Sequence, residues 1–137
     1  MKKILACAAA AALVGCASDP IATSASVPVP ESRIISADLM TQKPGTGTVI
    51  VKRDPAFYGS GCSYRLFANG APFADVNRGE KVQIYLPSGE HILGAKANGL
   101  CGGGNPETSF TLGAGQTRIF RVGVEASGDV KLHPTAF

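Results

Sequence analysis

The sequence has no tryptophan and only three tyrosines among its 137 residues. Aromatic side chains that offer a flat apolar face are therefore scarce. Because sugars usually bind on such faces, a carbohydrate-binding or peptidoglycan-binding function is less favoured than a protein-binding one. The four cysteines include no C-x-x-C pair, and His91 and His133 lie in no cluster with the spacing of metal ligands. No serine lies in a G-x-S-x-G motif. We therefore expect no catalytic residue, no metal site and no cofactor.

Long apolar runs are also scarce, and the single candidate is too short to cross a bilayer. Lys2 and Lys3 are followed by apolar or small residues from Ile4 to Val14, whereas a spanning helix needs about 20 such residues. This arrangement is typical of an export signal. Residues 1–15 are predicted to be a signal peptide.

The segment Leu13-Val14-Gly15-Cys16 resembles a bacterial lipobox. The resemblance implies cleavage before Cys16, a diacylglyceryl group on its sulfur and acylation of the new amine. It also implies an outer-membrane location facing the periplasm, because the next residue is Ala17 and not the aspartate that retains such proteins in the inner membrane. The alternative is ordinary cleavage after the small residues Gly15-Cys16-Ala17, which would leave a soluble periplasmic protein.

Two cysteines remain after this processing, Cys62 and Cys101. Cysteines in an oxidising compartment usually pair, so a structural disulfide is predicted, with a redox or metal-binding pair as the alternative. Closing a loop of this length stabilises the fold by about 4 kcal/mol through the entropy of the unfolded chain.

Removal of Lys2 and Lys3 leaves 11 basic against 10 acidic residues, a balance that argues against a nucleic-acid partner. Residues 16–32 contain the lipidated cysteine and a segment of small, polar and proline residues, which predicts a flexible linker. The folded domain is expected to comprise residues 33–137.

The domain sequence consists of short alternating runs separated by turn residues. This pattern predicts an all-β fold, namely a single antiparallel β-sandwich of about seven to nine short strands. Asn69-Gly70 is a hairpin signal, Pro72 marks an edge or irregular strand, and Gly113-Ala114-Gly115 is expected to join a further pair. The runs lie at residues 47–53, 62–69, 71–77, 80–87, 90–98, 107–113, 115–125 and 128–134.

The stretch from Tyr64 to Leu93 resembles the PEGA-type and related lipoprotein domains. The shared marks are the Asn69-Gly70 turn, Gly79 and the turn Pro87-Ser88-Gly89. The literal P-E-G-A tetrad is replaced by Pro87-Ser88-Gly89-Glu90. This resemblance implies an envelope surface or interaction module without catalytic residues.

Phe57 and Tyr58 lie in a turn-rich segment that the predicted disulfide would constrain, so they are candidate partner-binding residues. They could equally fold back to cap the sandwich. The glycine-rich residues 98–107 lack the G-K-[ST] of a phosphate loop and are interpreted as a mobile loop held at Cys101, with a ligand-binding loop as the alternative.

The sequence thus favours a non-catalytic accessory lipoprotein, anchored in the membrane by its lipid, that binds an envelope protein. A periplasmic glycan-binding module is the alternative, and an enzyme ranks last. For an enzyme, a carboxylate pair such as Asp75 and Glu80 could in principle converge, but two carboxylates on neighbouring strands are usually solvated. His91 is explained as well by a strand position that faces solvent as by a reactive role.

Overall fold

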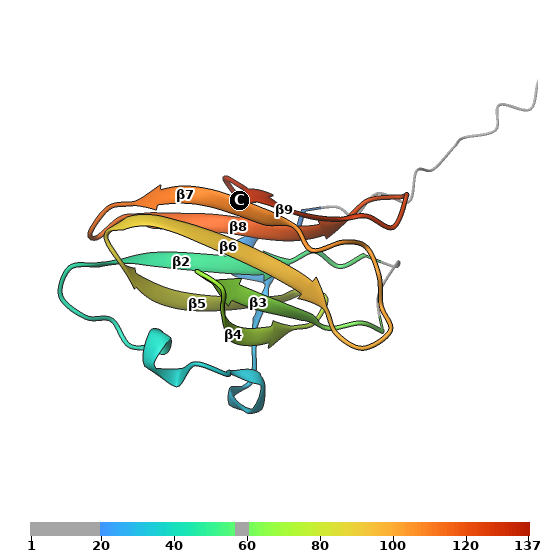
Figure 1. Ribbon diagram of the computed structural model, residues 1–137, viewed down its shortest axis with the longest axis horizontal. Coiled ribbons are helices and arrows are strands. Elements are labelled where there is room, and N and C mark those ends of the chain that lie inside the picture. The colour runs from blue at the N-terminus through green and yellow to red at the C-terminus, as the bar shows by residue number, and fades with distance from the viewer. Residues whose placement is uncertain (1–19, 57–60) are drawn as a thin grey trace, which may run out of the picture.

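The computed structural model describes residues 20–56 and 61–137. Nine strands in these residues form two stacked sheets, which confirms the predicted all-β sandwich (Figure 1). The strands are β1 (Val27–Pro28), β2 (Thr46–Arg53), β3 (Tyr64–Ala68), β4 (Ala71–Val76), β5 (Glu80–Pro87), β6 (Gly89–Ala97), β7 (Glu107–Leu112), β8 (Thr117–Val124) and β9 (Val130–Pro134). Three short 3₁₀ turns precede β2, namely η1 (Thr23–Ala25), η2 (Glu31–Arg33) and η3 (Ala37–Met40).

The two sheets differ in size and in strand direction. One contains five strands in the order β1-β5-β2-β8-β9, and the other contains four in the order β4-β3-β6-β7. The smaller sheet is wholly antiparallel, but β2 pairs parallel with β8 and β1 pairs parallel with β5. The sandwich is thus rich in antiparallel pairs, as predicted, and the larger sheet adds two parallel pairs between strands that are distant in sequence.

Alternation of apolar and polar residues places the core as predicted. Val82, Ile84 and Leu86 of β5 point inward and are no more than 4% exposed. The β3–β4 hairpin turns at Asn69-Gly70 with φ of 51° and 82°, the left-handed pair that a two-residue turn requires. β4 is an edge strand, as Pro72 indicated.

One predicted pairing is wrong. The strands on either side of Gly113-Ala114-Gly115 are β7 and β8, and they belong to different sheets. The turn carries the chain from one sheet to the other and packs closely against β2, where a Cβ on Gly47 would lie 2.5 Å from the carbonyl oxygen of Gly113. A local turn signal fixes where the chain reverses, but not whether the strands that follow share a sheet.

The boundary of the predicted linker is also corrected, because residues 20–32 lie against the sandwich. Val27 pairs with Glu80 of β5, and the N–H of Val29 donates to the carbonyl oxygen of Lys81 at 2.9 Å. The lysine on the neighbouring strand, Lys52, donates to Thr23 Oγ1 at 3.2 Å. Prolines and small residues look like a tether in sequence, but here they follow the surface of a sheet and bond to it.

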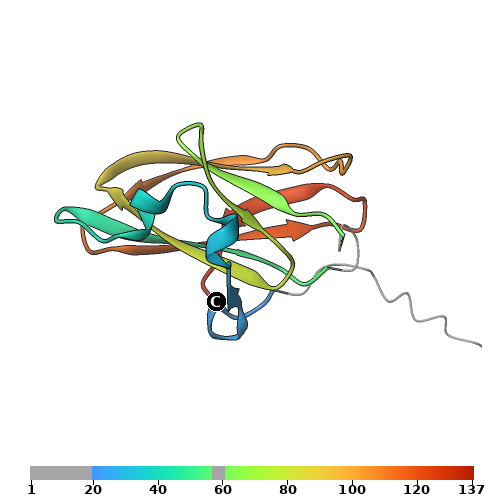
Figure 2. The ribbon, with the colours of Figure 1, turned by 90° about the horizontal axis from the view of Figure 1, so that it is seen from below.

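Residues 30–40 close one long side of the sandwich. In Figure 1 they lie below β4 and β5, and in Figure 2, seen from below, they cross in front of these strands. Ile34 bridges to Ala74 on β4, and η3 packs on β5. The opposite long side is bordered by β7 and β9 (Figure 1). Within the described residues, no helix has both the length and the apolarity to cross a membrane.

Candidate functional site

A disulfide joins Cys62 and Cys101 at one end of the sandwich, which confirms the predicted pair. Their Cα atoms are 6.2 Å apart, within the ordinary range. The bond ties the segment that follows β2 to the glycine-rich loop between β6 and β7. This end, which we call the disulfide end, also carries the β4–β5 and β8–β9 turns and lies at the right of Figure 1.

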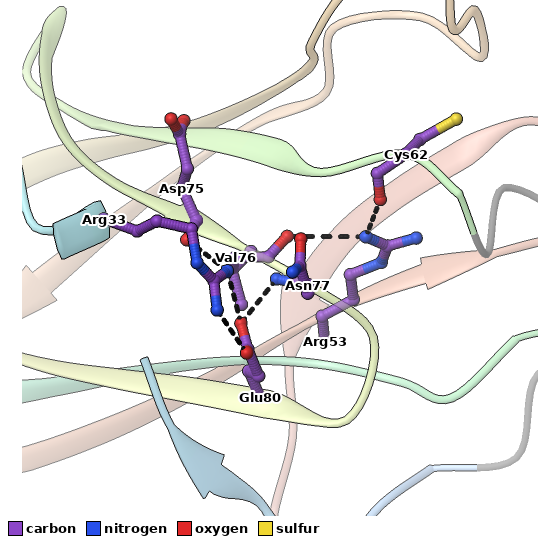
Figure 3. Close-up of polar contacts among 7 residues, drawn as sticks. All are labelled: Arg33, Arg53, Cys62, Asp75, Val76, Asn77 and Glu80. Carbon is purple, nitrogen blue, oxygen red and sulfur yellow. Dashed lines mark hydrogen bonds and ion pairs between the residues drawn. The ribbon is translucent and has the colours of Figure 1, made fainter. Parts of the chain in front are cut away.

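A buried arginine lies beneath the disulfide. Arg53, only 1% exposed, donates to the carbonyl oxygens of Cys62 and, at 3.4 Å, of Val76 (Figure 3). Its guanidinium carbon lies 4.3 Å from the centre of the Tyr64 ring, a cation–π distance. Burial lowers the pKa of Arg53 below its ordinary value. These contacts fix the main chain on both sides of the end, and they account for the arginine structurally.

A second arginine joins the two sheets at the same end. Arg33 reaches the Glu80 carboxylate with two hydrogen bonds of 2.7 and 2.5 Å and the carbonyl oxygen of Asp75 at 3.2 Å (Figure 3). Desolvation opposes ionisation of Glu80, but the bonds from Arg33 and from the Asn77 N–H outweigh it and hold the pKa of Glu80 below its usual value.

Asp75 and Glu80 do not converge as an acid–base pair would. The Asp75 side chain points away from Glu80 (Figure 3) and bonds Arg65 at 2.9 Å and Asn98 at 3.0 Å. The hydrogen bond from Arg65 is the main reason why the pKa of Asp75 is lowered. Both carboxylates are thus occupied by partners that hold the fold together.

His91 is buried, at 8% exposure, although the sequence suggested a position facing solvent. Its ring nitrogens lie 2.9 Å from Nδ2 of Asn69 and 2.7 Å from the carbonyl oxygen of Pro87. The ring also packs near Phe110, with centroids 5.7 Å apart. His91 therefore links the two turns at the far end of the sandwich, and both of its nitrogens are used in doing so.

The glycine-rich loop has a packing role on the edge of β9. The carbonyl oxygen of Gly103 accepts the N–H of Val130 at 2.7 Å. A Cβ on Gly103 would lie 2.6 Å from the Val130 side chain, so only glycine permits this approach. Pro134, at the other end of β9, has no N–H to offer. The outer edge of β9 is closed at both ends.

The outer edge of β7 is open. The N–H of Ala95 donates to the carbonyl oxygen of Pro106, and the register pairs Gly94 with Glu107. In an antiparallel ladder the bonded residues alternate, so the main-chain groups of Glu107, Ser109 and Thr111 point away from β6. All three residues are exposed, and within the described part of the chain no main-chain hydrogen bond from their N–H groups is found.

The other sheet edges are covered or short. β1 has two residues, one of them a proline, and shields the start of β5. η3 packs on β5, and the N–H of Ile35 donates to the carbonyl oxygen of Phe73 on β4. Proteins usually protect edge strands in these ways because bare edges pair with other chains. The edge of β7 is the exception among the described strands.

Two hollows lie on the outer face of the smaller sheet, beside this open edge. One, of about 250 Å³, extends over Gly94 between Phe67, Lys96, Pro106 and Glu107. The other, of about 500 Å³, is lined by Asn69, Glu90, Ser109 and Thr111 among others. Ile92, which is 48% exposed, contributes to both and separates them.

Gly94 opens the first hollow because it has no side chain. A Cβ there would lie 3.7 Å from its nearest neighbours, an ordinary contact distance. Neither a clash nor a left-handed backbone therefore requires glycine at this place in a central strand, where it costs about 0.5–1 kcal/mol relative to alanine. Together the hollows and the free edge of β7 are the candidate binding site, which we call the β7 face.

Sequence reasoning did not find the β7 face. Two features of the sequence belong to this face: Gly94 lies inside a strand pattern, and an uncharged run follows Glu107. Neither feature indicates a binding site until the register of β6 and β7 shows which main-chain groups are free. The predicted partner residues Phe57 and Tyr58, and the predicted lipidation site Cys16, lie outside the described residues. No group of three or more His, Cys, Asp or Glu that could hold a metal ion is found in residues 20–56 and 61–137.

No protein-family model matches the sequence, and no curated protein matches it either. The resemblance to PEGA-type domains therefore stays a prediction.

Proposed function

We propose that this protein is a lipid-anchored protein of the bacterial envelope, non-catalytic, that holds a protein partner by adding one of the partner's strands to β7. The anchor is supported by the lipobox-like Leu13-Val14-Gly15-Cys16 after a basic and apolar leader. The binding mode is supported by one observation above all, the unprotected edge of β7 in a sandwich whose other edges are covered or short.

The edge is suited to an extended segment of about five residues. From Glu107 to Thr111 a strand advances about 14 Å, and main-chain hydrogen bonds along this length supply affinity that does not depend on the partner's sequence. Side chains two residues apart lie about 7 Å from one another along such a segment. Alternate side chains of the partner lean over the outer face, towards the hollows on either side of Ile92.

The chemistry of the β7 face favours a segment of mixed character. Phe67, Ile92 and Pro106 offer apolar surface, whereas Lys96 and Glu107 present opposite charges. A peptide with an apolar residue flanked by polar ones complements both the apolar surface and the charges. Its main-chain groups form hydrogen bonds with the free main-chain groups of β7. The face offers a sugar no tryptophan. Phe67 lines the hollow over Gly94, and Phe110, which lines the other hollow, is buried.

The experiment is a comparison of Ser109→Pro with Ser109→Ala. Proline removes the outward N–H and leaves the bonds to β6 intact, since Ser109 does not donate to that strand. Alanine removes the hydroxyl alone. The full-length tagged protein is purified from gently solubilised membranes, the co-purifying envelope protein is identified, and its affinity for each purified variant is measured.

The expected result is that Ser109→Ala binds like the parent and Ser109→Pro binds at least tenfold more weakly, a change of about 1.4 kcal/mol. Circular dichroism verifies that both variants fold. Equal affinities would contradict strand addition at β7. Retention on isolated peptidoglycan without any protein partner would instead support the glycan-binding alternative.

A further inference from the structure

The N-terminal segment leads to the disulfide end of the sandwich. The N–H of Ile21 donates to Oδ1 of Asp54 at 3.3 Å, and Asp54 directly follows the last residue of β2, Arg53. Arg53 in turn bonds to Cys62, one half of the disulfide. Pro20, the first described residue, therefore lies beside the loops of this end.

Few residues separate Pro20 from the predicted attachment point. Cys16 precedes Pro20 by four positions, and four residues of fully extended chain span about 14 Å at most. A lipid on Cys16 would hold the bilayer surface within this distance of Pro20. The sequence alone predicted a flexible linker that extends to residue 32, and a linker of that length would let the domain stand away from the membrane.

The segment after Pro20 is bonded to the sheet and does not lengthen the tether. Thr23 Oγ1 donates to the main-chain oxygen of Phe137 at 2.7 Å, and Lys81 Nζ donates to the main-chain oxygen of Thr23 at 2.6 Å. The N–H of Val27 donates to the carbonyl oxygen of Gly79 at 3.0 Å. Release of the domain from the membrane surface would require these bonds to break.

The disulfide end presents an apolar side chain at its surface. Leu100 lies in the glycine-rich loop next to Cys101 and is fully exposed, at 107% relative to a reference residue. The disulfide holds this loop close to the end of β2. The β8–β9 turn carries Glu125 and Asp129 against Lys131, whose Nζ lies 3.9 Å from the Glu125 carboxylate, so this turn offers no net positive charge to anionic lipid and the proposed contact is apolar.

We propose that the disulfide end faces the membrane, with Leu100 in the interfacial layer of the lipid. This orientation rests on the proposed lipid anchor at Cys16. In this orientation the strands run roughly perpendicular to the bilayer, and the Asn69-Gly70 turn lies far from it. The open edge of β7 is then accessible from the side. A partner strand added to β7 would then run along the membrane normal.

The chain offers a direct test because it contains no tryptophan. Leu100→Trp places a single fluorescent reporter at the disulfide end, and Ala114→Trp places a matched reporter on an exposed turn at the opposite end. Each lipidated full-length variant is reconstituted into vesicles of phosphatidylethanolamine and phosphatidylglycerol, with or without brominated acyl chains that quench tryptophan on contact. Mass spectrometry of each preparation establishes whether Cys16 carries lipid.

We expect brominated lipid to remove most of the fluorescence of Leu100→Trp and to leave that of Ala114→Trp unchanged. A flexible glycine–serine insert after Ala17 is expected to abolish the difference. Equal quenching of the two reporters on a protein that carries lipid would overturn the orientation alone. Absence of lipid on Cys16 would overturn the proposed anchor, and with it the orientation that rests on the anchor.

Discussion

The N–H of Ile21 donates to Oδ1 of Asp54 at 3.3 Å, and the other oxygen of this carboxylate pairs with Arg121. One fully buried carboxylate thus joins the N-terminal segment, the end of β2 and the middle of β8. The contacts that hold the chain just after the proposed anchor at Cys16 are therefore part of the folded domain.

Replacement of Asp54 by alanine is expected to lower the free energy of unfolding by about 3 kcal/mol, because it leaves Arg121 without its buried carboxylate. Urea denaturation followed by circular dichroism measures this change. Asp38→Ala, at an exposed position, is the matched control and should stay within about 0.5 kcal/mol of the parent. Similar losses for the two variants would contradict the role of Asp54.

Loss of the disulfide should destabilise the domain and loosen the glycine-rich loop. A Cys62→Ala/Cys101→Ala variant is expected to lose about 4 kcal/mol of stability, since the bond spans a sequence separation of 39 residues. Hydrogen exchange at Val130, whose N–H donates to Gly103, should accelerate as well. An unfolding midpoint that is the same with and without reductant would show that the bond contributes nothing.

The ion pair between Arg33 and Glu80 predicts a dependence of stability on pH. Because the folded state lowers the pKa of Glu80 from its ordinary 4.5, its stabilising effect is present above that value and is lost as the pH falls through the lower folded pKa. Glu80→Gln should therefore reduce the melting temperature at pH 7 and differ less from the parent at pH 3. Glu90→Gln, at an exposed position, serves as the control, and a difference that does not change with pH would refute the assignment.

Two strand glycines are expected to respond oppositely to alanine. In Gly47→Ala the new methyl would lie 2.5 Å from the carbonyl oxygen of Gly113, and overpacking of this kind costs about 1–3 kcal/mol. In Gly94→Ala the nearest atoms are 3.7 Å away, so stability should stay equal or rise by about 0.5–1 kcal/mol. Thermal unfolding of the two variants in parallel measures both effects, and a loss of stability in Gly94→Ala would show that the hollow cannot accept a side chain.

Local patterns were sufficient for strands β2 to β9 and for the turns between them, but not for β1. Alternation of Val82, Ile84 and Leu86 with polar residues fixes which face of the strand is buried, because successive side chains point to opposite sides. Asn69-Gly70 fixes a tight hairpin, since both positions adopt positive φ. The disulfide was predictable because processing at Cys16 would leave two cysteines in an oxidising compartment.

Local patterns could not reveal which strands become neighbours. Val51 and Phe120 occupy paired positions on parallel strands although 68 residues of chain lie between them, and nothing near either residue indicates the partner. The burial of His91 also depends on other elements, because its contacts come from Asn69 in the β3–β4 turn and from Pro87 at the end of β5. The open edge of β7 likewise depends on register, which alternation leaves undefined without the adjacent strand.

By itself the sequence determined the class of fold, the turns, the inward face of regularly alternating strands such as β5, and the cysteine pair, all of which depend on residues close together or on simple pairing rules. Only the tertiary structure decided the mixed larger sheet, the attachment of residues 20–32 and the exposure of the β7 edge. These features follow from contacts between segments far apart in the chain, where burial and main-chain hydrogen bonding of the whole sandwich outweigh the preference of any short segment.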